Sequence, residues 1–229
     1  MILVAHGTRS THGLDTVARL AELVRRRIGS TRVSFVDVLG PTPSEVLAQT
    51  PQPTLVIPAF LAAGYHVRAD IPEHISASGH PDVTVSDNLG PDPRLAAVML
   101  DRLRAAGWRP GDAVVMAAAG SSDPLALADV EQAGRYLAHL IGDEVPVAYL
   151  TTATPRVPEV VEMVRNTRGG RVFIASYLLA SGFFHSRLSG FGANGVAAPL
   201  GADPRIAELI VNRVNGALHA TCRAGVRTM

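Results

Sequence analysis

Short apolar runs alternate with stretches of helical periodicity along most of the chain. Residues 2–5 and 54–58 are apolar at nearly every position, which is typical of strands in a parallel sheet covered on both faces. Elsewhere apolar residues recur every three or four positions, most clearly over residues 14–28, 125–140 and 206–218. The pattern predicts strands near residues 2–5, 33–37, 54–58, 83–86, 113–117, 145–150, 172–176 and 195–198. Strands that alternate with helices in this way predict an α/β fold.

One motif occurs twice in the chain. Residues 89–96 read Leu-Gly-Pro-Asp-Pro-Arg-Leu-Ala, and residues 200–207 read Leu-Gly-Ala-Asp-Pro-Arg-Ile-Ala. In both copies an aspartate followed by a proline predicts the start of a helix. Weaker matches join residues 3–7 to 116–120 and residues 55–66 to 172–185. We therefore expect two similar lobes related by internal duplication, each a small parallel sheet flanked by helices.

The turn-rich segment 108–112 is the natural joint between the two copies. On this interpretation the N-terminal lobe spans residues 1–107 and carries a candidate metal site. The C-terminal lobe spans residues 108–229 and forms the other wall of a cleft. Because the two copies already supply both lobes, we expect the active unit to be a monomer.

The charge balance argues against several classes of partner. The chain has 229 residues, and its 21 basic and 20 acidic residues give a net charge of +1, so neither nucleic acid nor an anionic membrane is an expected partner. All the basic residues are arginines, which excludes a Walker-type phosphate loop and a Schiff-base lysine. The single cysteine, Cys222, excludes a disulfide framework. The chain starts with a strand and has no apolar run of membrane-spanning length, so we expect a cytoplasmic protein.

Two histidines follow predicted buried strands. His6 comes directly after the first strand and opens a glycine turn, and His66 lies in the loop after residues 54–58. Parallel strands share one carboxyl edge, where open α/β folds bind their ligands, so the two imidazoles predict a metal or proton site. Asp37, at the end of the second strand, is the carboxylate best placed to join them. The alternative for Asp37 is a helix cap or a turn residue.

The second copy differs where this chemistry is expected. Ala119 is the counterpart of His6, and His66 aligns with Phe184 or His185, depending on where the alignment gap falls. We therefore expect the site in the first lobe alone. His185 has an alternative interpretation, in which its neighbourhood forms an apolar wall against a flat ligand.

Three motifs together resemble a known family. They are the residues from His6 to Arg9, the strand end at Asp37 followed by Pro41, and the loop that carries His66 and Asp70. In this combination, over residues 2–218, the chain resembles the class II chelatases of the sirohydrochlorin ferrochelatase and cobaltochelatase group, in their long, duplicated form. Where that family favours a glutamate, this chain has Asp37, which is one methylene shorter.

The resemblance implies insertion of a divalent metal into sirohydrochlorin, in sirohaem or cobalamin biosynthesis. His6 and His66 would handle the metal and the protons, with Asp37 as a further ligand, and no organic cofactor would be needed. Iron is the first candidate metal, cobalt the second and nickel a third. Sirohydrochlorin carries many carboxylates, which arginines bind well. The implied substrate-binding residues are Arg9, Arg68, Phe184, His185 and Arg187.

Two other functions fit the same residues. A non-catalytic carrier of tetrapyrrole or metal would also need histidines and arginines, and only multiple turnover separates it from an enzyme. An α/β protein that binds a phosphate ligand would use the glycines at the strand ends. The missing lysine and the missing glycine-rich fingerprint count against this second alternative.

Overall fold

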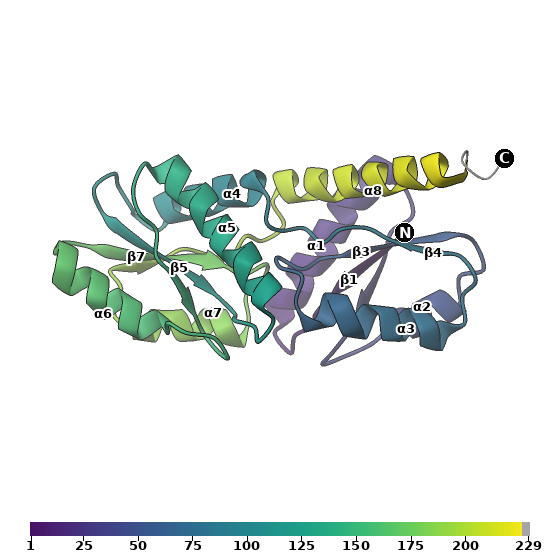
Figure 1. Cartoon of the computed structure of the whole chain (residues 1–229), viewed down its shortest axis with the longest axis horizontal. Helices are drawn as coiled ribbons and strands as arrows, with labels where there is room; N and C mark the ends of the chain where they lie inside the picture. Colours follow the sequence, from purple (N-terminus) through teal and green to yellow (C-terminus); the bar gives the residue numbers. More distant parts are fainter. Residues whose placement is uncertain (226–229) are drawn as a thin grey trace.

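The computed structural model describes the backbone of residues 1–225 and the side chains of residues 1–220. It contains two parallel sheets, with strand orders β2-β1-β3-β4 and β6-β5-β7-β8. The two sheets lie in neighbouring lobes along the long axis (Figure 1). The strands are β1 (Ile2–Ala5), β2 (Arg32–Phe35), β3 (Thr54–Pro58), β4 (Val83–Val85), β5 (Ala113–Ala118), β6 (Val147–Tyr149), β7 (Val172–Tyr177) and β8 (Gly195–Val196).

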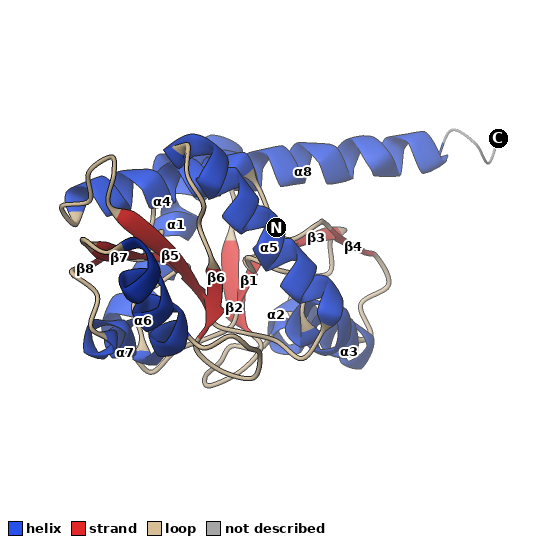
Figure 2. Ribbon diagram, turned by 60° about the vertical axis from the view of Figure 1, so that its left-hand side comes forward, coloured by secondary structure: helices blue, strands red, loops and turns tan. Residues whose placement is uncertain are grey.

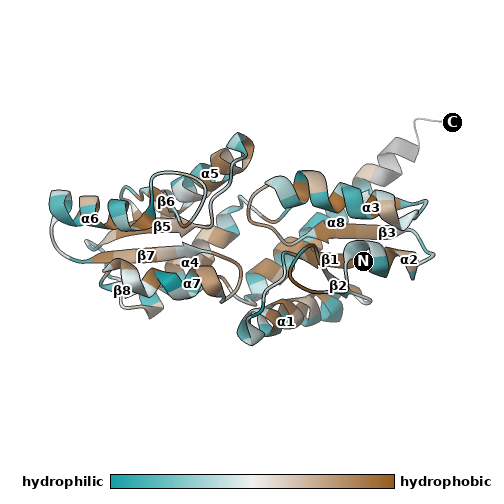
Figure 3. Cartoon of the chain, turned by 90° about the horizontal axis from the view of Figure 1, so that it is seen from below, coloured by the Kyte–Doolittle hydropathy of each residue, from teal (hydrophilic) through white to brown (hydrophobic). Residues whose placement is uncertain are grey.

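Helices connect the strands and cover both faces of each sheet (Figure 2). The central strands are strongly apolar and the outer helix faces are polar (Figure 3), as expected of a doubly covered parallel sheet. The expected α/β fold with two similar lobes is therefore confirmed. The helices are α1 (Thr11–Ile28), α2 (Pro43–Ala48), η1 (His66–Asp70), α3 (Ile71–Ser78), α4 (Pro93–Ala105), α5 (Pro124–Ile141), α6 (Val157–Arg168), α7 (Phe183–Leu188), η2 (Ser189–Phe191) and α8 (Pro204–Gly225).

The same tight turn follows the first strand of each lobe. Gly7 has φ +100° and Gly120 has φ +104°, a region that glycine adopts readily. A Cβ on Gly7 would lie 2.1 Å from the carbonyl oxygen of Asp37, and a Cβ on Gly120 would lie 2.0 Å from that of Thr151. The two turns thus make the same close approach to the loop after the neighbouring strand. The pairing makes Ala119 the counterpart of His6 and Thr151 the counterpart of Asp37.

The terminal helix of each repeat packs on the other lobe. α4 belongs to the first repeat but lies against α5 and β7, whereas α8 belongs to the second and lies against α1 and β3. One apolar core consequently runs through both lobes and includes Leu3, Met99, Met116 and Ile210. The two repeats therefore do not pack as separate units on either side of residue 108. The domain boundary proposed at that residue remains a prediction.

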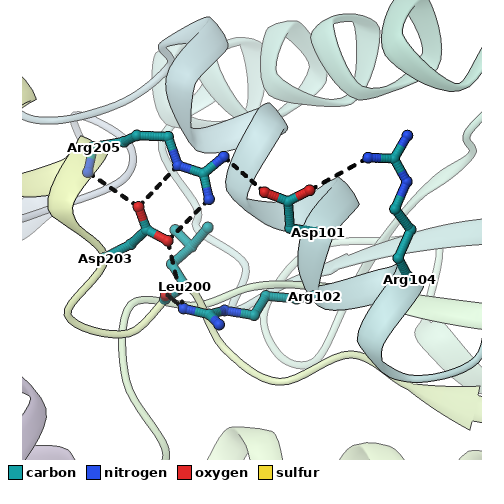
Figure 4. Close-up of polar contacts among 6 residues, drawn as sticks. All are labelled: Asp101, Arg102, Arg104, Leu200, Asp203 and Arg205. Carbon is teal, nitrogen blue, oxygen red and sulfur yellow. Dashed lines mark hydrogen bonds and ion pairs between the residues drawn. The ribbon is translucent and has the colours of Figure 1, made fainter.

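Reciprocal arginine contacts fix this exchange of helices. Arg102 on α4 donates to the carbonyl oxygen of Leu200 (3.1 Å), just before α8 (Figure 4). Arg213 on α8 donates to the carbonyl oxygen of Asn88 (2.9 Å), just before α4. Since the two arginines hold equivalent positions in the repeats, the contact has approximate two-fold symmetry, like an isologous dimer interface within one chain.

Within the part of the chain that the structure describes, none of the helices combines the length and the hydropathy that a membrane span requires. Cys222 lies outside the residues whose side chains are described.

Candidate functional site

His6 marks the start of the candidate site, directly after β1. Its backbone carbonyl accepts from the amide of Asp37 (3.0 Å), so the end of the first strand and the loop after β2 stay in register. The imidazole is exposed, and its Nδ1 lies 3.1 Å from the carbonyl oxygen of Gly7. With Nδ1 protonated and donating to that carbonyl, Nε2 keeps a free lone pair.

His66 opens the π-helical turn η1, in the loop after β3. Its ring lies edge-on to that of His6, with centroids 4.5 Å apart and an interplanar angle of 85°. The structure therefore brings together the two histidines that the sequence singled out. Phe60 stacks near the ring of His66 at 5.9 Å and supplies an apolar side to the pair.

Asp70 is a site residue that the sequence analysis did not assign a role. Its Oδ2 lies 2.5 Å from Nδ1 of His66, and its side chain is only 19% exposed. A carboxylate bound to Nδ1 fixes the imidazole orientation and leaves Nε2 free to bind a metal, as in many histidine metal sites. The signal was present in the sequence, because residues four apart on one helical turn face each other.

Asp37 is beside His6 along the backbone, but its carboxylate is engaged elsewhere. The side chain is exposed, and Oδ1 accepts from the amide of Val38 (2.7 Å). Among the described residues there is no group of three or more histidine, cysteine or acidic side chains placed to hold a metal ion. The arrangement is thus a pair of histidines, and Asp37 as a third ligand remains a proposal.

The predicted substrate-binding arginines differ in how far their guanidinium groups are already engaged by other residues of the chain. Arg9 is exposed and has no ion-pair partner within the described part of the chain. Arg187 is exposed and lies over the ring of Phe183, 5.6 Å from its centroid. Arg68, by contrast, donates to the carbonyl oxygen of Ala63 (2.9 Å) and pairs with Asp123 across the lobes (3.2 Å).

The strand registers settle which second-lobe residue corresponds to His66. Val56 pairs with Ile2 in the first sheet, and Ile174 pairs with Val115 in the second, so the two strands align without a gap. The alignment continues through the loops, because the amide of Arg68 donates to the carbonyl of Gly64 and the amide of Ser186 donates to that of Gly182. Phe184 is therefore the counterpart of His66, and Leu188 is the counterpart of Asp70.

The second lobe is apolar at these positions. Leu188 is fully buried, and Ala119 and Phe184 pack against the same apolar cluster. His185 corresponds to Val67 and points back into its own lobe, where Nε2 lies 3.2 Å from the carbonyl oxygen of Ala197. Phe183 is 72% exposed and Tyr65, its first-lobe counterpart, is 65% exposed, so these are the aromatic side chains most open to a ligand.

Comparison with known proteins extends over nearly the whole chain. The CbiX family model matches residues 1–106 and again residues 113–217. The chain is 24% identical over 201 residues to a sirohydrochlorin ferrochelatase of Priestia megaterium, covering 82% of this chain and 76% of that protein. It is 27% identical over 136 residues to a sirohydrochlorin cobaltochelatase of Methanopyrus kandleri, covering 46% of this chain and 95% of that protein.

Solved structures share the fold. SirB from Bacillus subtilis with Fe3+ matches with a TM-score of 0.81 at 24% identity, covering 94% of both chains. The structure of CbiX described as the terminal enzyme for biosynthesis of siroheme in denitrifying bacteria matches with a TM-score of 0.70 at 21% identity. That match covers 94% of this chain and 98% of the other.

Proposed function

The chain belongs to the CbiX family, and on that premise we propose that it inserts a divalent metal into sirohydrochlorin. The resemblance to the sirohydrochlorin chelatases, in their duplicated form, is confirmed by the two family matches and by the curated relatives. The observation that carries the proposal is the juxtaposition of the His6 and His66 imidazoles at the carboxyl edge of the first sheet.

The histidine pair suits transfer of a metal ion. Neutral imidazole nitrogens bind Fe, Co and Ni, and a site with few protein ligands releases its ion more readily than a closed four-ligand cage. Insertion replaces two pyrrole N–H protons of the macrocycle by one divalent ion, so two protons have to leave. Each imidazole that gives up the ion regains a lone pair with which it accepts one of them. The Asp70 carboxylate stabilises the imidazolium that forms at His66.

The substrate is proposed to lie between the histidine pair and the second lobe. Arg9 and Arg187 have guanidinium groups available for the carboxylates of the macrocycle. Phe183 offers an exposed ring surface, while Phe184 and His185 support it from within their own lobe. Arg68 is tied to Ala63 and Asp123, so its part is to hold the loop. The duplicated lobes supply both sides, and a monomer is the proposed active unit.

Iron is the proposed metal, with cobalt as the second candidate. The ferrochelatase relative aligns with 82% of this chain, whereas the cobaltochelatase relative aligns with 46%. Imidazole alone does not choose between the ions, because its affinity follows the general order of divalent metals.

The direct test is anaerobic incubation of the purified protein with sirohydrochlorin and each of Fe²⁺, Co²⁺ and Ni²⁺, with loss of the metal-free absorption spectrum as the readout. We expect the protein to accelerate insertion, fastest with Fe²⁺, over many turnovers in excess substrate. Equal rates with and without protein would reject the enzyme. A single stoichiometric turnover would indicate a carrier.

A further inference from the structure

The loop that carries His66 is attached to the second lobe by three side-chain contacts. Tyr177 Oη donates to the carbonyl oxygen of Leu61 (2.8 Å), and the amide of Ala63 donates to Asp129 Oδ2 (2.9 Å). Farther along the loop, Arg68 pairs with Asp123. These contacts begin five residues before His66 and end two residues after it, so they bracket the histidine.

The contact from Tyr177 comes from the interior of the second lobe. Tyr177 is the last residue of β7 and is 3% exposed. Burial raises the pKa of its hydroxyl well above the ordinary value, so the group remains a proton donor at any physiological pH. Packing around it is tight, because a Cβ on Gly90 would lie 2.3 Å from this hydroxyl and 2.2 Å from the Leu61 carbonyl oxygen. The hydroxyl is thus held against one fixed point of the loop.

The contacts from α5 and its N-cap bind the loop through two carboxylates, those of Asp123 and Asp129. Asp123 caps α5 by accepting from the amide of Leu125 (2.9 Å) and pairs with Arg68 as well. The Arg68 guanidinium also donates to the carbonyl oxygen of Ala63. The amide of the same residue, Ala63, donates to Asp129, which lies six residues after Asp123 on α5. Carboxylates that accept from backbone amides or guanidinium groups form the stronger class of hydrogen bond.

We call the contacts of Tyr177, Asp129 and Asp123 with the His66 loop the clamp. Among the described residues, the equivalent loop of the second lobe has no corresponding set of contacts. The first-lobe counterparts of Asp123 and Asp129 are Ser10 and Thr16. Ser10 also caps its helix, α1, by accepting from the amide of Gly13, but Thr16 donates to the carbonyl of His12 within its own helix.

Two more positions complete the asymmetry. The counterpart of Tyr177 is Ala59 and the counterpart of Arg68 is Ser186. Neither can make the corresponding contact, since Ala59 lacks a polar side chain and Ser186 donates to Phe183 in its own helix. The loop that begins at Ser181 approaches α1 of the first lobe closely, since a Cβ on Gly13 would lie 2.7 Å from the carbonyl oxygen of Ser181.

We propose that the second lobe sets the position of His66 relative to His6, with Tyr177, Asp129 and Asp123 as positioning residues. The inference rests on the proposed function, because it assigns these contacts to the metal-handling pair. It gives the second lobe a task in the reaction besides binding substrate. A shift of about 1 Å in a reacting group costs up to about 100-fold in rate, so hydrogen bonds that fix a loop are sufficient to matter.

The test compares Tyr177→Phe and Asp129→Ala with matched controls. Tyr149→Phe removes the hydroxyl of another buried tyrosine, which contacts Glu131 away from the histidines. Asp129→Asn keeps an oxygen that can accept from Ala63, and Asp123→Ser reproduces the first-lobe cap while removing the ion pair. Two readouts are needed: the nuclear Overhauser effect between the His6 and His66 rings in histidine-labelled protein, and kcat and KM for insertion.

We expect Tyr177→Phe and Asp129→Ala to weaken the ring-to-ring effect and to lower kcat about 10-fold each, with KM for sirohydrochlorin little changed. Asp129→Asn should restore most of kcat, and Tyr149→Phe should match the parent in both readouts. The proposal is overturned if the ring-to-ring effect is unchanged in both variants, or if Tyr149→Phe lowers kcat equally. The spectroscopic readout holds even if the parent protein inserts no metal, so failure of the proposed function is distinguishable from failure of the clamp.

Discussion

The two lobes have the same backbone fold but carry different side chains at three equivalent positions. His6, His66 and Asp70 surround the candidate site of the first lobe, and their counterparts Ala119, Phe184 and Leu188 form part of an apolar cluster in the second. The glycine turn and the strand register are the same in both. The turn alone therefore does not make the site. It places whatever side chain follows the strand at the sheet edge, and the side chain decides the chemistry.

Other contacts are the same in both lobes. Asp92 caps α4 and binds Arg94, and Asp203 caps α8 and binds Arg205. Each pair lies at the start of a helix that packs on the other lobe. Because both lobes have this contact at the start of the exchanged helix, we expect it to serve the fold.

Converting the first lobe into the second should have the largest effect. His6→Ala and His66→Phe install the second-lobe residues, and each removes a ligand and proton acceptor that nothing adjacent replaces. We expect insertion to fall about 10²- to 10⁴-fold for each variant, with the fold retained. Steady-state rates measure the loss, and circular dichroism checks the fold. Parent-like turnover in either variant would place the active site elsewhere.

The next largest effect is expected at Asp70. Asp70→Leu again installs the second-lobe residue and leaves His66 without the partner of its Nδ1. Loss of such an orienting carboxylate typically lowers metal affinity or activity about 10- to 100-fold. Titration with Co²⁺, followed by its absorption spectrum, measures the affinity directly. Asp70→Asn, which can still accept a hydrogen bond from Nδ1, should fall between the parent and Asp70→Leu. Equal affinities in all three proteins would mean that the carboxylate has no part in the site.

A smaller effect is expected at His185, the histidine of the second lobe. Its Nε2 already contacts the carbonyl of Ala197, so the ring supports α7 from within. We expect His185→Ala to raise KM for sirohydrochlorin about 3-fold, through a less ordered α7, and to leave kcat near that of the parent. A loss as large as in the first-lobe histidine variants would assign metal handling to both lobes.

The smallest effect concerns the contacts that both lobes share. Hydrogen bonds from Arg205 lower the pKa of Asp203. Burial acts to raise the pKa of Asp92, but hydrogen bonds from Arg94 together with nearby positive charge lower it below its ordinary value. A lowered pKa in the folded state stabilises the protein above the ordinary aspartate pKa of about 3.9, and this stabilisation is lost progressively as the pH falls from that value through the folded-state pKa.

Asp92→Asn and Asp203→Asn keep the helix cap and remove the charge. Each should cost about 1 kcal/mol of unfolding free energy at pH 7 and less at pH 3, without changing kcat. Urea unfolding at the two pH values is the measurement. Unequal costs at the two positions would show that this contact is not shared equally by the lobes.

Local patterns predicted much of this molecule. The strand positions, the helix starts at Asp92 and Asp203, and the duplication all follow from short-range signals: apolar runs, aspartate-proline caps and repeated motifs. The pairing of His6 and His66 was also predictable, because both follow strands of one parallel sheet.

Contacts between the two repeats could not be predicted from the pattern of apolar and polar residues. An amphipathic helix shows which of its faces is buried but not on which of two similar sheets, so the exchange of α4 and α8 was not foreseen. The orientation of Asp37 depends on a turn with positive φ at Val38, which nothing in the side-chain pattern indicates. The clamp on the His66 loop likewise joins residues distant in sequence, and only the assembled lobes bring Asp129 to Ala63.

The exchanged helices also bear on how the chain folds as it is synthesised. The face of the first sheet formed by Leu3 and Ile57 is covered in part by α8, which starts only at Pro204. Until α8 leaves the ribosome, an emerging first repeat exposes apolar strand surface. The contacts that cover this surface join α8 to α1 and β3, which are far apart in the sequence. Folding should therefore be completed late and cooperatively, and the first repeat expressed alone should depend on chaperones or on self-association to cover that face.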